Sequence, residues 1–519
     1  MGCKRPPRDR LVAAILRPPR RARPTSGIWA PRARCLPVGA AQGPSMGTEP
    51  QRSRSLLLRS PTWPADVARR TSSEAPCGPE DAAEDGPGRA LREEQWKEVG
   101  DLVGVLHHFK NLAQLLEEEL SPEAVQELTG LQRSFWREPC QKCAAATSGA
   151  ALGRAWGGPA GSWQVVGELP AATPLGRLVE PPFRRRELLL HSGARARGGG
   201  GLQRLSSCGV AAVTMKGKKG RSDLSLGQDN LSVSRLASGW QCICVADGHG
   251  PDGHWVATRA ARTIPFFLMQ AECDALLRDG RAEEALRRAF HRAEADLEQH
   301  GHEEQVRLYM SGCAATCVLR SPGARRAWAA CAGDSRAALL AAGASPLQET
   351  RDHHPRVESE LARCVEMGCE LGVEEHEDGY VERRIFVKGK GYPGLLMTRS
   401  LGDLSVKGHG VVSTPEVVEW PTPQGALLIV ASDGVWEVMS TQKASEIIFE
   451  ALGNGKSRQQ AVEVLASAAR ARWAEEDEDY CDDITVVLAP ADEDWPALGS
   501  RSVACPCGAG LSRGPCTLQ

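Results

Sequence analysis

Apolar residues between positions 208 and 489 follow two kinds of pattern, which are short continuous runs and helical spacing. Runs of about four to eight apolar residues, bounded by glycine, proline or aspartate, are typical of strands. Such runs occupy 208–214, 229–235, 240–246, 313–319, 326–332, 336–341, 426–431 and 484–489. Helical spacing of apolar residues occurs at 254–269, 281–299, 357–367, 442–452 and 458–474. Strands in adjacent blocks, with helices between some of them, predict an α+β fold with largely antiparallel sheets.

The segments that flank this pattern differ in character. Residues 1–91 are rich in Arg, Pro and Ala and cannot bury a core, so we predict disorder. Residues 92–138 show helical spacing, and Ser121-Pro122 supplies an N-cap and a first-turn proline, which predicts a helical hairpin. This hairpin is either a structural appendage or a regulatory, partner-binding module. We expect a linker over 139–205 and a disordered tail over 493–519.

Composition narrows the class of protein. The 519 residues are 41% hydrophobic but 5% aromatic, with 54 glycines and 34 prolines, so one good core is expected, but not along the whole length. A net charge of −2 provides no general basic field for nucleic acid. Several of the 18 cysteines (Cys242, Cys244, Cys317, Cys331) fall inside predicted strands, which indicates reduced, buried thiols in a cytosolic-type compartment. No apolar run approaches the roughly 20 residues that cross a membrane.

The first residues leave the location of the protein open. The start Met1-Gly2-Cys3-Lys4-Arg5 is similar to a doubly acylated, polybasic membrane anchor, although Pro6 stands where the myristoylation pattern has Ser or Thr. An Arg-rich, acid-poor start also suits an organelle transit peptide. We expect a cytoplasmic or nuclear protein, and keep anchoring through Gly2 and Cys3 or organelle targeting as alternatives.

Aspartates stand at the ends of five predicted strands. Asp247, Asp334 and Asp433 follow strands, whereas Asp229 and Asp482 precede them. In antiparallel pairing the end of one strand lies beside the start of its neighbour, so these carboxylates can gather on one rim. Their repulsion would raise their pKa values unless cations bind. Oxygen-only ligands suit Mg²⁺ or Mn²⁺, and we expect a site for two or more ions.

Eight short motifs, in one order, carry a family resemblance. They are Gly227-Gln228-Asp229-Asn230, Asp247-Gly248-His249-Gly250, Ser311-Gly312-Cys313-Ala314-Ala315-Thr316, Gly333-Asp334-Ser335-Arg336, Asp352-His353-His354-Pro355, Thr398-Arg399-Ser400-Leu401-Gly402-Asp403, Ser432-Asp433-Gly434-Val435-Trp436-Glu437 and Asp482-Asp483-Ile484-Thr485. With them, the stretch from about Cys208 to Asp492 resembles the metal-dependent type 2C serine/threonine protein phosphatases (PPM/PP2C-like). We therefore expect a catalytic domain over 206–492. The resemblance implies two packed, largely antiparallel β-sheets (a β-sandwich) flanked by α-helices, with a metal cleft at one end.

The resemblance also implies roles for the aspartates. Asp247 would bridge two metals, and the backbone carbonyl of Gly248 would bind one of them. Asp433 and Asp482 would complete the other metal's ligands, and Asp229 would act at the metal-water shell.

The implied reaction is hydrolysis of phosphoserine and phosphothreonine by direct attack of a metal-bound water. His249 would protonate the leaving seryl or threonyl oxygen, so His249 and Asp247 are the expected catalytic residues. Asp334 and Glu437 are candidates for a weaker third ion.

The chain departs from the family pattern at several positions. Gln228 replaces the usual Glu and removes one negative charge, Glu437 stands where Asp is common, and Leu224 replaces the Arg that grips phosphate. A nearby basic group could supply the missing cation, although Lys cannot fork onto two phosphate oxygens as Arg does. The group consists of Lys216, Lys218, Lys219 and Arg221. Its alternative role is a solvated loop.

Residues 351–411 should form a flap beside the cleft. Within it, Arg399 and Asp403 are expected to form a structural ion pair or to support a substrate loop, and not to act as catalysts.

Three functions compete. The leading hypothesis is an active protein phosphatase in signalling, with a phosphorylated protein as substrate, no nucleic-acid partner and a monomeric catalytic domain. A non-catalytic, phosphatase-like module that binds a partner is the main alternative. The joint presence of Asp247, Asp433 and Asp482 argues against this alternative, whereas Gln228 and Leu224 keep it open. A hydrolase of small phosphate esters is the third.

Overall fold

The computed structural model describes residues 161–169, 179–192, 195–221, 223, 225–304, 306–323, 326–343, 345–375 and 381–497. The predicted disordered segment 1–91, the helical hairpin 92–138 and most of the tail 493–519 lie outside the described residues, as does Leu224.

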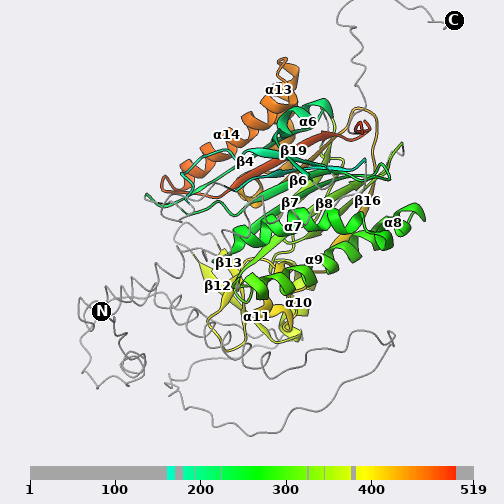
Figure 1. Cartoon of the computed structure of the whole chain (residues 1–519). Helices are drawn as coiled ribbons and strands as arrows, with labels where there is room; N and C mark the ends of the chain where they lie inside the picture. The colour runs from blue at the N-terminus through cyan, green and yellow to red at the C-terminus, as the bar shows by residue number, and fades with distance from the viewer. Residues whose placement is uncertain are drawn as a thin grey trace, which may run out of the picture.

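Two antiparallel sheets, packed face to face, form the centre of the molecule (Figure 1). The larger sheet has the order β16-β9-β8-β7-β6-β1-β2-β3, with β15 paired to β8. Its strands are β1 (Trp163–Gly167), β2 (Leu188–Ser192), β3 (Arg195–Gly200), β6 (Asn230–Arg235), β7 (Gln241–His249), β8 (Gly312–Arg320), β9 (Arg326–Ala332), β15 (Leu401–Gly402) and β16 (Glu416–Pro421). The smaller sheet has the order β11-β10-β17-β19-β4. Its strands are β4 (Ala211–Met215), β10 (Arg336–Leu340), β11 (Gln348–Glu349), β17 (Leu427–Ala431) and β19 (Ile484–Pro490). The predicted fold class, two largely antiparallel sheets with helices, is confirmed.

Strand β7 shows why the sheets are buried on both faces. Successive side chains of a strand point to opposite faces, so Ile243 and Val245 enter the core between the sheets, while Cys242 and Cys244 face the helices. Helices cover the outer faces of both sheets (Figure 1). On the larger sheet these are α7 (Gly253–Leu268), α8 (Ala271–Arg278) and α9 (Ala282–Glu304), and on the smaller sheet α13 (Thr441–Gly453) and α14 (Arg458–Glu476). Because both faces of β7 meet apolar layers, its sequence is a nearly continuous apolar run.

The region predicted as a flap, residues 351–411, has a small core of its own. Its elements are α10 (Glu358–Glu366), β12 (Cys369–Glu375), β13 (Val381–Val387), β14 (Pro393–Leu395) and α11 (Leu404–Lys407). Apolar side chains such as Cys364, Ile385 and Val406 pack together there, apart from the two sheet cores. Figure 1 shows β12, β13, α10 and α11 gathered at one end of the molecule.

Four short elements complete the described structure. They are α6 (Gly201–Ser207), α12 (Asp433–Trp436) and the paired strands β5 (Lys218–Lys219) and β18 (Tyr480–Cys481). Every cysteine within the described ranges is a buried free thiol, as expected for Cys242, Cys244, Cys317 and Cys331. Among the helices of these ranges, none is both long and apolar enough to cross a bilayer.

The prediction of a linker over 139–205 is wrong for its described part. Strands β1, β2 and β3 and helix α6 all come from this segment, and β1 lies inside the larger sheet, between β6 and β2. Trp495, from the predicted tail, is also buried, and its ring centroid lies 5.9 Å from that of Trp163. The sequence conceals these elements because each apolar run is short and its pairing partners lie far away in the chain.

Replacing Trp163 with alanine tests whether β1 belongs to the core. Trp163 is fully buried and packs against Trp495 and the guanidinium of Arg204. We expect the free energy of unfolding of the full chain to fall by about 3–5 kcal/mol in chemical denaturation. Leu202→Ala, at an exposed position of the nearby helix α6, is the control and should change it by less than about 0.5 kcal/mol. Equal, small effects of both changes would contradict a core position for β1.

Candidate functional site

The ends and starts of four strands bring together the aspartates that the sequence singled out. Asn230 pairs with Ala246, so Asp229 at the start of β6 lies beside Asp247 near the end of β7. Ala431 pairs with Val486 in the other sheet, so Asp433, just after β17, lies near the start of β19, which Asp482 precedes. The hydroxyl of Ser432 donates to Asp229 Oδ2 at 2.7 Å and joins the two sheets at this point. We call Asp229, Asp247, Asp433 and Asp482 the carboxylate rim.

Burial and mutual repulsion perturb the acidity of the carboxylate rim. Burial, and then the charges of Asp483 and Asp482, raise the pKa of Asp229 to about 7. Burial, and then the charges of Asp433 and Asp229, raise the pKa of Asp247 well above its ordinary value. The pKa of Asp433 rises for the same reasons, with burial first and the charge of Asp482 next. These groups thus lack the positive charge that would keep them ionised.

Asp482 is the exception within the carboxylate rim. Burial acts to raise its pKa, but the ammonium of Lys219, 3.3 Å from Asp482 Oδ1, outweighs burial and lowers it. The hydroxyl of Tyr480 also donates to Asp482 Oδ2 at 2.9 Å. Asp482 therefore stays ionised, and its charge is part of what raises the pKa of Asp433.

The carboxylate rim fits a hard divalent cation. Asp229 Oδ1, Asp247 Oδ2 and Asp334 Oδ1 are buried without a hydrogen-bond partner. Unpaired carboxylate oxygens of this kind are the ligands that Mg²⁺ and Mn²⁺ prefer. Within the described ranges, no three His, Cys, Asp or Glu side chains converge closely enough to form a complete metal site. A cation held here would therefore need ligands besides carboxylates, such as water or backbone carbonyls.

The tip of β7 is closely packed. A Cβ on Gly248 would lie 2.3 Å from the carbonyl oxygen of Gly253 and 2.8 Å from that of Gln228, so only glycine fits. The side-chain amide of Gln228 donates to the carbonyl oxygen of Gly250 at 2.6 Å. An ionised glutamate could not donate this hydrogen bond, so the departure at residue 228 has a structural reason: the amide ties the start of β6 to the tip of β7.

His249 is paired with a buried carboxylate that the sequence did not connect with it. Its Nε2 lies 2.7 Å from Asp403 Oδ2, and its Nδ1 is buried without a hydrogen-bond partner. Burial acts to lower the pKa of His249, but the charge of Asp403 outweighs it and the pKa is raised. Ser400 donates to the same carboxylate at 2.6 Å. The backbone of Asp403 is left-handed, with φ 50°, a conformation that Asp tolerates better than most residues.

Within the described part of the chain, Arg399 and Asp403 do not form the expected ion pair with each other. Arg399 instead donates to Glu360 of α10 at 2.6 Å, within the flap, while Asp403 turns to His249. No local pattern could have revealed the second contact, because 154 residues separate its partners.

The two candidates for a third ion lie next to the carboxylate rim. Asp334 follows β9 and is buried. Burial raises its pKa, and the charge of Asp352 adds to this rise, although the charge of His354 acts in the opposite direction. Glu437 ends the short helix α12 and is exposed. Both residues contribute to the negative field that raises the pKa of Asp433.

The four basic residues proposed for phosphate binding do not act as one group. Lys216 is buried in an ion pair with Asp223 at 2.6 Å, which contradicts its predicted role at an open phosphate site. Lys218 and Arg221 both pair with Asp479, at 3.0 and 2.7 Å. Only Lys219, paired with Asp482, lies at the carboxylate rim. Asp479, which pairs with Lys218 and Arg221, lies more than 250 residues further along the chain, so no local pattern could have revealed these two pairs.

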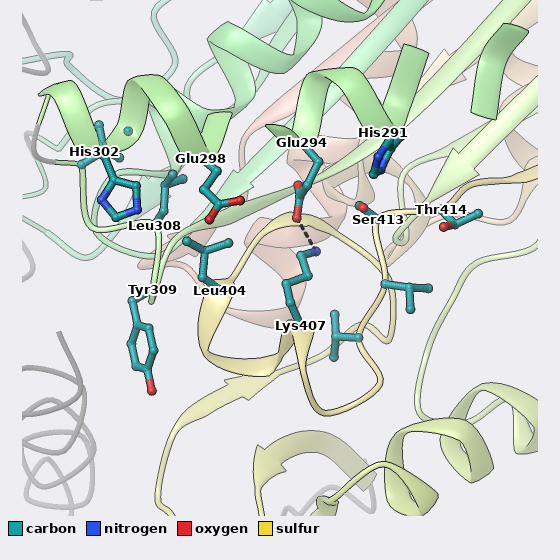
Figure 2. A pocket seen from close by; sticks show the side chains of 14 residues that line it. His291, Glu294, Glu298, His302, Leu308, Tyr309, Leu404, Lys407, Ser413 and Thr414 are labelled. Carbon is teal, nitrogen blue, oxygen red and sulfur yellow. Dashed lines mark ion pairs between the residues drawn. The ribbon is translucent and has the colours of Figure 1, made fainter. Parts of the chain in front are cut away.

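A pocket of about 670 Å³ lies between α9 and the loop after Asp403 (Figure 2). In Figure 2, Glu294 of α9 and Lys407 of α11 point toward each other, and their charged atoms are 3.3 Å apart. Glu294 also accepts a hydrogen bond from the backbone N–H of Gly402 at 2.8 Å. The pocket contains no residue of the carboxylate rim, but its wall supports the loop that holds Asp403 against His249.

Two further residues, which the sequence did not predict, contact the backbone next to Asp229. Glu180 and Arg186 form a buried ion pair, with Arg186 Nη2 3.1 Å from Glu180 Oε2. Both contact the loop 227–229, which carries Asp229. They lie in the segment that was interpreted as a linker, where an Arg-rich, Pro-rich sequence gives no sign of burial.

Comparison with known proteins identifies the family. The family model described as protein phosphatase 2C matches residues 210–477. The probable protein phosphatase 2C 64 of Oryza sativa subsp. japonica is 33% identical over 275 residues, which cover 51% of this chain and 61% of that protein. The probable protein phosphatase 2C 73 of Arabidopsis thaliana is 29% identical over 265 residues, which cover 47% of this chain and 69% of that protein. This chain thus spans less than two thirds of the rice relative.

Among solved structures, the crystal structure of serine-threonine phosphatase 2C from Toxoplasma gondii aligns with a TM-score of 0.44 at 19% identity, covering 53% of this chain and 93% of that one. Because the family model matches more than half of its residues, the chain belongs to the protein phosphatase 2C family.

Proposed function

We propose that this chain is a metal-dependent protein serine/threonine phosphatase that hydrolyses phosphoserine and phosphothreonine in protein substrates. The observation that carries the proposal is the carboxylate rim, with buried oxygens on Asp229 and Asp247 that have no protein partner. Like charges buried together destabilise a fold unless cations offset them. Membership of the protein phosphatase 2C family supports the same reaction.

The residues that would hold the cations are Asp229, Asp247, Asp433, Asp482 and the carbonyl of Gly248, with Asp334 and Glu437 for a third ion. Two or more Mg²⁺ or Mn²⁺ ions supply, when bound, the Lewis acidity that activates an attacking water and offsets charge on the phosphoryl oxygens. The chain's own contribution is a rigid arrangement of oxygens fixed at strand ends in two packed sheets.

His249 is the proposed general acid for the leaving seryl or threonyl oxygen. Asp403 binds Nε2, which leaves Nδ1 as the ring nitrogen without a hydrogen-bond partner. A histidine whose Nε2–H donates to a carboxylate has its ring orientation fixed, and its charged form is favoured. We infer that Asp403 orients His249 and that His249 donates the proton from Nδ1.

Lys219 is the proposed phosphate contact. It belongs to the predicted basic group, and its ammonium lies 3.3 Å from Asp482 Oδ1 at the carboxylate rim. An anionic phosphoryl group bound beside Asp482 would therefore meet a positive charge. A lysine provides this as a point charge and does not impose the two-pronged geometry of arginine.

Phosphate release by the full chain from a phosphothreonine peptide tests the proposed activity. We expect release with Mn²⁺ or Mg²⁺ and none with a chelator. Asp433→Asn keeps the shape of the side chain but removes a charge, and should lower kcat/KM by at least about 100-fold. Asp274→Asn, which affects an exposed pair on α8, is the matched control and should leave kcat/KM unchanged.

The outcomes of this assay separate the competing functions. A folded chain that releases no phosphate with either cation would favour a non-catalytic, partner-binding module. Release from small phosphate esters, without release from the phosphopeptide, would favour a small-ester hydrolase.

Asp403→Asn tests how His249 is oriented. The change keeps the shape and the left-handed backbone but removes the charge that holds His249. General-acid catalysis matters most for a poor leaving group, so we expect kcat for the phosphothreonine peptide to fall by about 10-fold or more, and kcat for p-nitrophenyl phosphate by less than about 3-fold. Equal losses on both substrates would show that the change damages the site as a whole and would contradict the orienting role.

The pKa of Asp229 predicts how the effect of metal on stability depends on pH. Its folded-state pKa of about 7 lies above the unfolded value of about 3.9, so the folded chain binds more protons between these values and loses stability as pH rises. A bound cation removes this loss. The increase in unfolding temperature on adding Mn²⁺ should therefore be larger at pH 7.5 than at pH 5.5, measured by thermal unfolding against a chelator control. In Asp229→Asn, the unfolding temperature without metal should lose this part of its pH dependence; an unaltered pH profile would refute the assignment.

A further inference from the structure

The segment 179–192, which we call the strap, connects the two sheets. Its first half runs antiparallel to the end of β4, the edge strand of the smaller sheet: Lys216 N–H donates to the carbonyl of Arg184 at 3.0 Å, and Arg186 N–H donates to that of Thr214 at 3.0 Å. Its second half is β2, which pairs with β1 in the larger sheet. The strap therefore has a fixed position relative to both layers, near the point where the carboxylate rim forms.

The strap places a fully buried ion pair against the loop 227–229. The side chains of Arg186 and Glu180 are 2% and 0% exposed. The guanidinium of Arg186 donates to the carbonyl oxygens of both Gly227 and Asp229. Glu180 Oε2 accepts the N–H of Gly227 at 3.0 Å. The two side chains thus bind the backbone of the loop at both of its ends.

The positive charge of Arg186 is balanced by Glu180 and not by an aspartate of the carboxylate rim. Its ionic partner is Glu180, and its other contacts are backbone carbonyls, so it does not neutralise the carboxylate of Asp229. The pair therefore fixes where Asp229 lies without reducing its capacity to bind a cation.

Stability alone does not explain the pair. Burying two charges costs desolvation free energy that roughly cancels their attraction, so a buried ion pair is weak evidence for stability. A fully satisfied buried polar network does, however, select one geometry of the groups it contacts. Here the contacted group is the loop that carries Asp229 and also Gln228, whose amide binds the tip of β7.

We propose that Glu180 and Arg186 are positioning residues for the metal site, acting through the loop 227–229. This inference rests on the proposed function, because Asp229 is a metal ligand only within that proposal. Both residues lie outside the segment 210–477 that matches the family model. Partners of metal ligands typically alter metal affinity by about 10–100-fold, and we expect an effect of this size.

The test is Mn²⁺ binding by the full chain, measured without turnover from the signal of free Mn²⁺ in electron paramagnetic resonance. Arg186→Lys leaves Glu180 with a positive partner but removes the fork that reaches both carbonyls. Its Kd for Mn²⁺ should rise by about 10-fold or more, while kcat on p-nitrophenyl phosphate at saturating Mn²⁺ stays within about 3-fold of the wild type. Arg185→Lys is the matched control: Arg185 is the preceding residue, is half exposed and pairs with Glu463 at 2.9 Å, and its Kd should not change.

Glu180→Gln provides a second, milder variant, because an amide oxygen can still accept the N–H of Gly227. A smaller rise in Kd than in Arg186→Lys is expected. A folded Arg186→Lys chain with the wild-type Kd would overturn the inference. Unfolding of both variants, with or without Mn²⁺, would also overturn it, because the pair would then act on overall stability. Failure of the wild-type chain to bind Mn²⁺ would instead contradict the proposed function itself.

Discussion

Like charges buried at the junction of two sheets constrain everything around them. Asp229 and Asp247 belong to the larger sheet and Asp433 to the end of a strand in the smaller one, and the packed layer between the sheets prevents them from moving apart. Their raised pKa values express the free energy stored in this arrangement. In the proposed function, a cation bound at the rim would relieve this repulsion.

The groups around the carboxylate rim hold it in place without neutralising most of it. Gln228 binds a backbone carbonyl, Arg186 binds two carbonyls and is neutralised by Glu180, and the carboxylate of Asp403 binds His249. Positive charge that reaches a carboxylate of the rim directly comes from Lys219, at Asp482. These surrounding groups thus fix the geometry of the carboxylate rim but leave most of its negative charge unbalanced. In the proposed function, a bound cation would balance that charge.

The sequence revealed the rim but not its support, for a physical reason. Asp247 and Asp433 follow apolar runs, and antiparallel pairing places the end of each run beside the start of a strand that Asp229 or Asp482 precedes. Apolar runs with aspartates at their ends were therefore enough to predict each pair, whereas the meeting of the two pairs depends on how the sheets pack. Lys216 looked like an exposed loop cation, yet it is buried against Asp223. Asp403 contacts a histidine 154 residues away, and Arg186 contacts carbonyls about 40 residues away, distances at which no periodicity operates. Contacts of this kind depend on the packing of the whole domain, which a single sequence does not display.

The match to the family model and the physical unit also have different boundaries. The match begins at residue 210, but β1 lies inside the larger sheet, between β6 and β2, and cannot be removed without exposing two rows of backbone hydrogen-bonding groups. The indole N–H of Trp163 in β1 donates to the carbonyl of Pro496 at 3.3 Å, so the two ends of the described chain meet on one side of the sheet. A fragment that starts at residue 200 would retain every residue of the carboxylate rim and lose both β1 and the strap. The family can therefore be recognised within residues 210–477, whereas Asp482 of the carboxylate rim, the strap and β1 all lie beyond this segment.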